Sequence, residues 1–150
     1  MTAILETRVF GRVADLYADV TSLAGGGHVV VWYNYGFETG GSTSAGVLAQ
    51  IFDAAGTATS APFVLNIVTA SRRLYPVVEA STTARFVAAW TTGNDGDGYG
   101  IRVARYDSTG TMVGTEQLTK SPYHQHSVSP EVAVAADGSF VVTCWTVLTW

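Results

Sequence analysis

One glycine-rich stretch holds the densest group of oxygen ligands in the sequence. Asn94, Asp95 and Asp97 alternate there with glycines, in the order Thr-Thr-Gly-Asn-Asp-Gly-Asp-Gly-Tyr-Gly. Ca²⁺ takes about six to eight oxygen ligands, and these three side chains with nearby backbone carbonyls could supply part of that set. An acidic turn between two strands explains the same residues, because Asp, Asn and Gly are favoured in tight turns. The turn is the favoured interpretation, calcium is a possible cofactor, and no other cofactor is expected.

A second group combines aromatic rings with polar side chains that could hold a sugar. Its members are Tyr33, Asn34, Tyr35, Phe37, Glu38 and, in a later loop, Tyr99. Ligand sites commonly combine aromatic surfaces with a few well-placed polar groups. An ordinary surface loop is the alternative, since connecting segments run over the surface whether or not they bind anything. We take these residues as the candidate ligand contacts and glycans as a possible partner.

The sequence contains no arrangement typical of an enzyme. It lacks a nucleophile elbow, a phosphate-binding glycine loop and a metalloprotease helix motif. Asp95 and Asp97 are paired acids, but both lie in one short loop, whereas glycoside hydrolysis needs carboxyl groups that flank a bond. His124 and His126 could start a zinc site, yet the single thiol, Cys144, lies in an apolar run where a buried position is expected. The sequence therefore predicts that the protein is not an enzyme.

Composition and charge argue against two classes of partner. The 150-residue chain has a net charge of −4 and only eight Lys and Arg residues, too few for a surface that neutralises phosphates. No apolar run is long enough to span a bilayer, and residues 1–10 lack the basic start and apolar centre of a secretory signal. The 16 glycines and the low charged fraction of 13% favour an all-β fold with many turns. We expect no nucleic-acid partner and no membrane insertion.

The elements that would position these residues come from a repeat. Three apolar runs end in tryptophan, at residues 28–32, 86–90 and 140–145, and the tryptophans are 58 and 55 residues apart. Nearly continuous apolar runs of this length indicate strands that are covered on both faces. The tryptophan that ends each run is therefore expected to pack between repeats.

Downstream of the first two runs the match continues. Residues 46–57 and 100–111 share an alternating strand followed by Asp-x-x-Gly, offset by 54 residues throughout. With a short strand before each tryptophan run and another after the turn, each unit holds four antiparallel strands, the content of a propeller blade. The expected divisions are blade repeat 1 at residues 16–69, blade repeat 2 at 74–120, a partial repeat 3 at 128–150 and a possible closing strand at 1–15.

The predicted fold is all-β, with about two and a half to three four-stranded propeller blades. Propellers typically have about four to eight blades, so something further must complete a ring. We expect self-association into a homo-oligomer, with a fragment of a longer repeat protein as the alternative. Residues 4–23 also fit a helical stripe, and we prefer strands after Asp15 because the repeat places them there.

The landmarks of the repeat resemble a known family. They are Pro-x-Val-Ala-x-x-x-Asp-Gly-x-Phe-Val-Val-x-x-Trp at residues 130–145 and a Gly, then [Tyr/Phe]-Asp-x-x-Gly, at 100–110 and 46–56. This pattern resembles the propeller-type tandem repeats of large bacterial surface and secreted proteins, including calcium-dependent adhesins and toxin-like exoproteins. The resemblance covers about residues 16–145 and implies an extracellular binding or scaffolding role. No catalytic residue belongs to it, and the first copy departs from it with glycines at 25–27.

Together these patterns predict a non-catalytic, lectin-like β-propeller module that assembles with itself and binds carbohydrate through its loops. The alternatives are a structural segment of a larger adhesin, with or without calcium, and a designed propeller fragment with no ligand of its own. Only the loop residues that break the repeat, at 33–38 and 94–99, are left to carry function.

Overall fold

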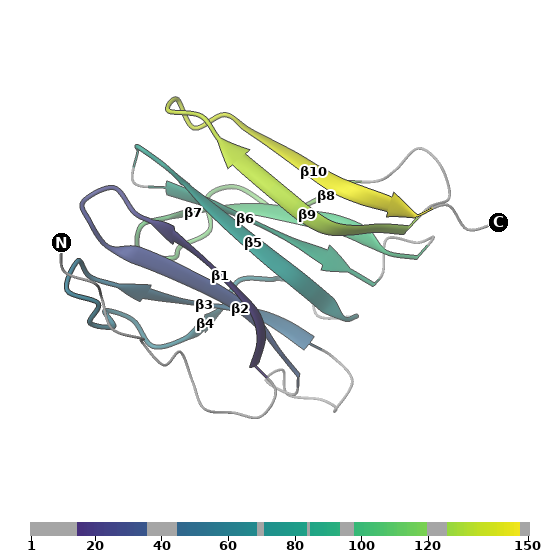
Figure 1. Cartoon of the computed structure of the whole chain (residues 1–150), viewed down its shortest axis with the longest axis horizontal. Helices are drawn as coiled ribbons and strands as arrows, with labels where there is room; N and C mark the ends of the chain where they lie inside the picture. The colour runs from purple at the N-terminus through teal and green to yellow at the C-terminus, as the bar shows by residue number, and fades with distance from the viewer. Residues whose placement is uncertain are drawn as a thin grey trace.

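The computed structural model describes residues 15–35, 45–68, 71–83, 85–93, 98–119 and 126–147. These residues form three antiparallel sheets, shown in sequence order from purple to yellow in Figure 1. Blade 1 consists of β1 (Asp15–Ser22), β2 (His28–Tyr35), β3 (Ala45–Phe52) and β4 (Phe63–Val64). Blade 2 consists of β5 (Arg73–Ser81), β6 (Arg85–Thr92), β7 (Gly100–Asp107) and β8 (Gln117–Thr119). Blade 3 consists of β9 (His126–Val134) and β10 (Phe140–Val147).

Within each blade, strands that follow one another in the chain are neighbours in the sheet. This up-and-down order is the strand order of a propeller blade. The predicted all-β fold of antiparallel blades is confirmed, with two and a half blades in the described residues. β1 begins at Asp15, so the preference for a strand over a helical stripe after that residue is confirmed as well. The described residues contain no helix that is long and apolar enough to span a membrane.

Asp-x-x-Gly turns follow β3 and β7, as the sequence predicts. In blade 1, Asp53 Oδ1 accepts hydrogen bonds from the N–H groups of Ala55 (2.9 Å) and Thr57 (2.8 Å). Gly56 and Gly110 have φ values of 81° and 87°, a left-handed conformation that glycine adopts without a clash at Cβ. The turns therefore form for the local reasons that their sequence indicates.

Two apolar layers hold the blades together. Successive side chains of a strand point to opposite faces of a sheet, so β6 contributes to both layers. Phe86, Ala88 and Trp90 pack in the layer between blades 1 and 2. Val87 and Ala89 pack in the layer between blades 2 and 3. β6 is thus covered on both faces, as its nearly continuous apolar sequence predicts.

Trp145, the third tryptophan of the repeat, is not at the position in β10 that corresponds to Trp90 in β6. Phe86 pairs with Ala80 of its first strand and Phe140 with Val134, which are equivalent positions. Cys144, four residues after Phe140, therefore corresponds to Trp90. Trp145 lies one residue further on, which turns its side chain to the opposite face of the sheet. It is 76% exposed, and Cys144 is exposed as well. Within a single chain, therefore, Trp145 does not pack between blades and Cys144 is not buried, contrary to both predictions.

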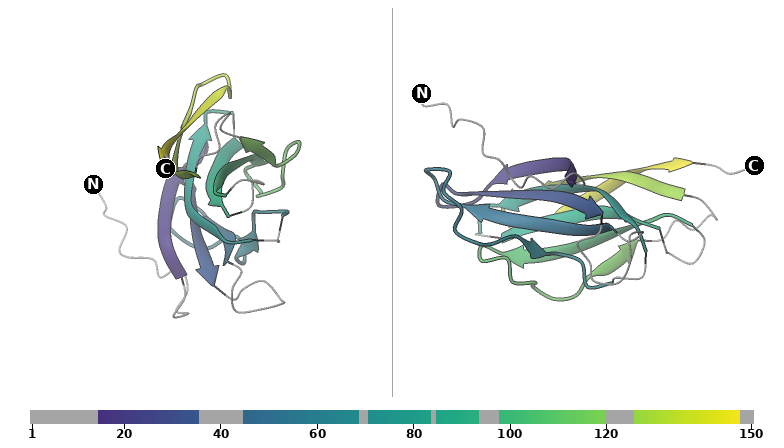
Figure 2. Two further views of the ribbon diagram at one scale, coloured as in Figure 1. Left: turned by 90° about the vertical axis from the view of Figure 1, so that its right-hand side faces the viewer. Right: turned by 90° about the horizontal axis from the view of Figure 1, so that it is seen from below.

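The first strands of the three blades, β1, β5 and β9, pack side by side, and Figures 1 and 2 show them from three directions. In each of them the pairing with the second strand slips at a two-residue bulge. The first bulge residue is Tyr17, Tyr75 or Ser129, with φ of 49°, 52° and 52°. Left-handed φ is uncommon for residues other than glycine. Because a left-handed residue recurs at the same position of all three blades, the bulge is a regular part of each blade.

Candidate active site

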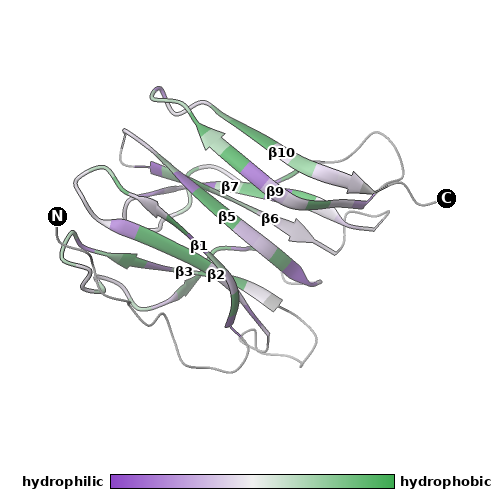
Figure 3. Cartoon of the chain, in the orientation of Figure 1, coloured by the Kyte–Doolittle hydropathy of each residue, from purple (hydrophilic) through white to green (hydrophobic). Residues whose placement is uncertain are grey.

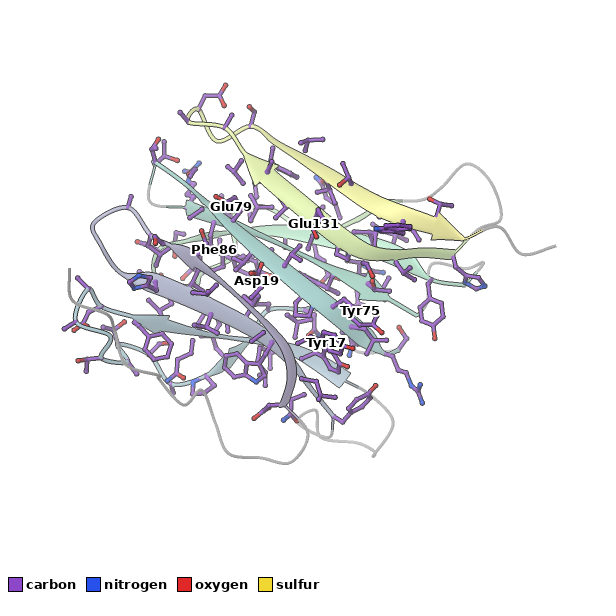
Figure 4. All side chains as sticks on the ribbon, viewed as in Figure 1. Tyr17, Asp19, Tyr75, Glu79, Phe86 and Glu131 are labelled. Atoms are coloured by element: carbon purple, nitrogen blue, oxygen red, sulfur yellow. The ribbon has the colours of Figure 1, made fainter. Side chains whose placement is uncertain are left out.

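A cleft of about 430 Å³ opens where the three first strands carry their bulges. Its lining comes from the same three positions in each strand: residues 17–19 of β1, 75–77 of β5 and 129–131 of β9. Figure 4 labels Tyr17, Asp19, Tyr75 and Glu131 along these strands. The repeat therefore brings segments from all three blades to one site.

The sequence of each bulge explains its local structure. The second bulge residue is alanine in β1 and proline in β5 and β9. Proline has no N–H to donate to a ladder, so a bulge is one of the few strand positions that accept it. The third residue returns to the ladder and is Asp19, Val77 or Glu131. Blades 1 and 3 therefore carry a carboxyl group at one equivalent position, with a valine on the blade between them.

The carboxylate of Asp19 is held by backbone N–H groups. Its Oδ2 accepts a hydrogen bond from Val78 N at 2.8 Å, and its Oδ1 accepts one from Val20 N at 2.9 Å. Val78 belongs to β5, so this side chain connects blade 1 to blade 2. The side chain is half-buried, and its two hydrogen bonds fix its orientation at the edge of the cleft.

Glu131 has a different environment. It lies on β9 and is exposed. Within the described part of the chain it forms no hydrogen bond and no ion pair. Its carboxyl group is therefore available to a ligand in the cleft, whereas that of Asp19 is positioned by the fold.

Four tyrosines form an aromatic cluster that extends from the cleft into blade 1: Tyr17, Tyr33, Tyr35 and Tyr75. The Tyr17 ring stacks on that of Tyr33, with centroids 5.8 Å apart, and meets Tyr75 edge to face at 4.9 Å. Tyr33 also meets Tyr35 edge to face at 5.5 Å. Burial, followed by the neighbouring tyrosines, raises the pKa of Tyr33 to about 12. Tyr33 is therefore a buried, protonated support for the more exposed Tyr17.

Two of the candidate ligand contacts, Tyr33 and Tyr35, belong to this cluster. Tyr99 lies elsewhere, with its ring 5.4 Å from that of His126. Its N–H donates to His126 Nδ1 at 3.1 Å, and its carbonyl accepts from Ser127 N at 2.8 Å. The structure therefore places Tyr99 at the junction of blades 2 and 3 and does not bring it to Tyr33.

Asn34 is 3% exposed, and its amide donates to Asp15 Oδ1. The same oxygen accepts a hydrogen bond from Trp32 Nε1 at 3.0 Å. The amide is thus engaged inside blade 1. The other two candidate contacts, Phe37 and Glu38, lie outside the described residues.

The candidate calcium ligands Asn94, Asp95 and Asp97 also lie outside the described residues. Over the part of the chain that the structure describes, no group of three or more His, Cys, Asp or Glu side chains could hold a metal ion. The calcium site stays a prediction.

Sequence reasoning missed Asp19, Glu131, Tyr17 and Tyr75, although the repeat contains a signal for the two acids. Residues 18, 76 and 130 align as one position of the repeat, and the residue after it is acidic in two of three copies. Blade construction does not need an acid there, because the second copy uses valine. An acid that replaces an apolar residue of the repeat was therefore the signal to follow.

The fold is that of propeller-type, all-β proteins, and solved structures share it. One is the endo-arabinase from Bacteroides thetaiotaomicron VPI-5482, with a TM-score of 0.60 and 14% identity over 95% of this chain and 55% of that chain. Another is the α-L-arabinofuranosidase from Lactobacillus brevis, with a TM-score of 0.55 and 16% identity over 91% of this chain and 47% of that chain. The chain thus spans about half the length of these neighbours. No protein-family model and no curated protein matches the sequence.

Both neighbours are enzymes by name, which overturns two predictions: a non-catalytic binding module, and a chain that is not an enzyme. Asp95 and Asp97, the paired acids considered from the sequence, lie in one short loop. The structure places Asp19 and Glu131, from two different blades, along one cleft. The resemblance to bacterial tandem repeats holds for the all-β, propeller-type fold.

Proposed function

We propose that this chain takes part in hydrolysing a glycosidic bond of an arabinose-containing glycan, with Asp19 and Glu131 as the two reacting carboxyl groups. The observation that carries the proposal is their position: the same place in the repeat, on blades 1 and 3, along one cleft. The substrate class is taken from the two structural neighbours, whose names refer to arabinan and arabinofuranoside cleavage.

The chemistry needs one carboxylic acid and one carboxylate on either side of the bond. Glu131, which is exposed and open to a ligand, protonates the glycosidic oxygen as the bond to the anomeric carbon breaks. Asp19, held by two N–H groups, either takes a proton from the attacking water or attacks the anomeric carbon itself. Each of its oxygens keeps a second lone pair for this role.

The finer resemblance, to repeats of bacterial surface and secreted proteins, supports a place of action outside the cell. A glycan substrate is consistent with that location. The cleft would be one part of a larger binding surface, since the chain spans about half the length of the neighbours.

The test is hydrolysis of arabinan and of 4-nitrophenyl α-L-arabinofuranoside. We expect Asp19→Asn and Glu131→Gln each to lower kcat by about 10²- to 10⁴-fold, the usual contribution of a general acid or base. Glu79→Gln is the matched control, because Glu79 is also an acid of a first strand but does not line the cleft. This control should leave kcat unchanged, and thermal melting should verify that all three variants fold.

Two results would contradict the proposal. One is a wild-type protein that cleaves neither arabinan nor 4-nitrophenyl α-L-arabinofuranoside. The other is a loss of activity in Glu79→Gln as large as that in Asp19→Asn, which would indicate a general effect of altering the first strands.

A further inference from the structure

We infer that Tyr17 and Tyr75 form an aromatic platform that binds a sugar ring next to the two carboxyl groups. This inference rests on the proposed function for the class of ligand. It adds a binding role for residues that take no part in breaking the bond.

The first argument is the conformation of the two tyrosines. Their φ values of 49° and 52° are unfavourable for bulky side chains. Ser129 has the same φ of 52° at the same position of blade 3. The fold therefore requires a left-handed residue at this position, but it does not require an aromatic one. The two aromatic rings need another explanation.

The second argument is that the platform is both open and supported. Tyr17 is 62% exposed, so its ring does not fill a core. Its orientation is nevertheless fixed, because Tyr33 stacks beneath it at an interplanar angle of 14° and Tyr75 meets it edge to face. Tyr33 itself is only 4% exposed. An exposed ring held in one orientation by neighbouring rings, of which Tyr33 is buried, is a preorganised surface for the apolar C–H face of a sugar.

The third argument is the arrangement around the cleft. Tyr17 lies two residues before Asp19 on blade 1, and Tyr75 occupies the equivalent position on blade 2. On blade 3 this position, two residues before Glu131, is the small Ser129. One wall of the cleft is therefore aromatic and the other is small and polar. A saccharide would place one ring against Tyr17 and Tyr75 and extend its neighbouring unit toward Glu131.

The platform is tested with variants that copy the third blade. Tyr17→Ser and Tyr75→Ser remove a ring while keeping a residue that this fold already accepts in the left-handed conformation. Tyr17→Phe keeps the ring and removes only the hydroxyl group. Titration with arabino-oligosaccharides should give a Kd raised about ten-fold or more in the serine variants, as expected for a lost aromatic contact, and unchanged in Tyr17→Phe.

Two readouts separate this role from a structural one and from catalysis. The ring C–H proton signals of the bound sugar should shift upfield with the wild type and with Tyr17→Phe, but not with Tyr17→Ser. In hydrolysis, the serine variants should raise KM and leave kcat within about two-fold, because they remove uniform binding. The carboxyl variants should instead lower kcat.

The outcomes distinguish the two ideas. If Asp19→Asn loses activity while Tyr17→Ser binds as tightly as the wild type, the platform is wrong and the hydrolytic role stands. A second outcome is that neither the wild type nor any variant hydrolyses the substrate, while the serine variants lose binding and the upfield shifts. In that case the platform stands and the hydrolytic role is wrong. Equal binding by all variants overturns the platform.

Discussion

Acidic side chains in this protein differ in what their oxygens accept. Asp107 Oδ1 accepts from the Thr109 hydroxyl at 2.6 Å and from Thr111 N at 3.0 Å, all within one turn. The Thr109 hydroxyl, followed by the Thr111 backbone N–H, holds the pKa of Asp107 below its ordinary value of 3.8. Asp19 accepts a hydrogen bond from another blade, and Glu131 accepts none within the described residues. The Asp107 carboxylate is therefore engaged within its own turn, whereas Asp19 and Glu131 line the cleft.

The turn acid gives a prediction about pH. Because the pKa of Asp107 is lower in the folded than in the unfolded chain, its stabilising effect is complete above about pH 4 and is lost as the pH falls through the folded pKa. We expect Asp107→Ala to melt at a lower temperature than the wild type at neutral pH, with the two melting temperatures converging as the solution is acidified. Ser108→Ala in the same turn is the control. A difference between wild type and Asp107→Ala that is equal at every pH would contradict the assignment.

At the scale of the strands, most of the architecture could be predicted because its signals are local. The apolar runs of β2 and β6 and the Asp-x-x-Gly turns depend on neighbours in the sequence. The fourth strands are short, at Phe63–Val64 and Gln117–Thr119, and the sequence does not indicate how far their pairing extends. Hydrogen bonding at an outer edge depends on tertiary packing, which the sequence pattern does not contain.

The bulges could not be predicted, and the candidate site depends on them. Left-handed residues are usually indicated by glycine or asparagine, but here they are Tyr17, Tyr75 and Ser129. The side of the sheet to which Trp145 points could not be predicted from the tryptophan repeat either. Its 55-residue spacing from Trp90 departs by one residue from the 54-residue offset of the prolines, and a one-residue slip reverses a strand side chain.

One hydrogen bond between blades allows a prediction about stability. The Tyr106 hydroxyl in β7 donates to the Leu65 carbonyl of blade 1 at 2.8 Å, and both residues are buried. Tyr106→Phe would leave that carbonyl without its donor, so we expect a loss of about 1–3 kcal/mol in the free energy of unfolding, measured by urea denaturation. Tyr99→Phe is the control, since the Tyr99 hydroxyl makes no hydrogen bond within the described residues. A loss in Tyr106→Phe no larger than in this control would show that the bond contributes little.

At the scale of the whole molecule, the two ends of the row of blades expose apolar residues whose counterparts are buried. Val141 of β10 is 57% exposed, whereas its equivalent in blade 2, Val87, is 3% exposed. Val20 of β1 is 57% exposed, whereas its equivalent, Val78, is 3% exposed. Figure 3 shows the hydrophobic stretch of β10 along the edge of the row. Blade 1 of a second copy, packed on blade 3 of the first, would cover both of these exposed valines.

Self-association therefore stays a prediction with a direct test. Light scattering after size exclusion should give a mass of at least twice the 15.8 kDa of one chain. Val141→Lys should shift the protein toward the monomer, because it places a charge in the proposed contact. Ile67→Lys is the control, since Ile67 is 64% exposed and its N–H donates to Glu116, which places it where blades 1 and 2 meet. A monomeric wild type would contradict the prediction.

The repeated bulge also bears on how such a protein can acquire new chemistry. In each first strand the left-handed residue and the alanine or proline after it set the backbone, so the third position is held in place whatever side chain it carries. Asp19, Val77 and Glu131 occupy this same backbone position in the three blades. Duplicated blades could then gain or lose a reactive group by a single codon change in one blade, while the surrounding backbone stays the same.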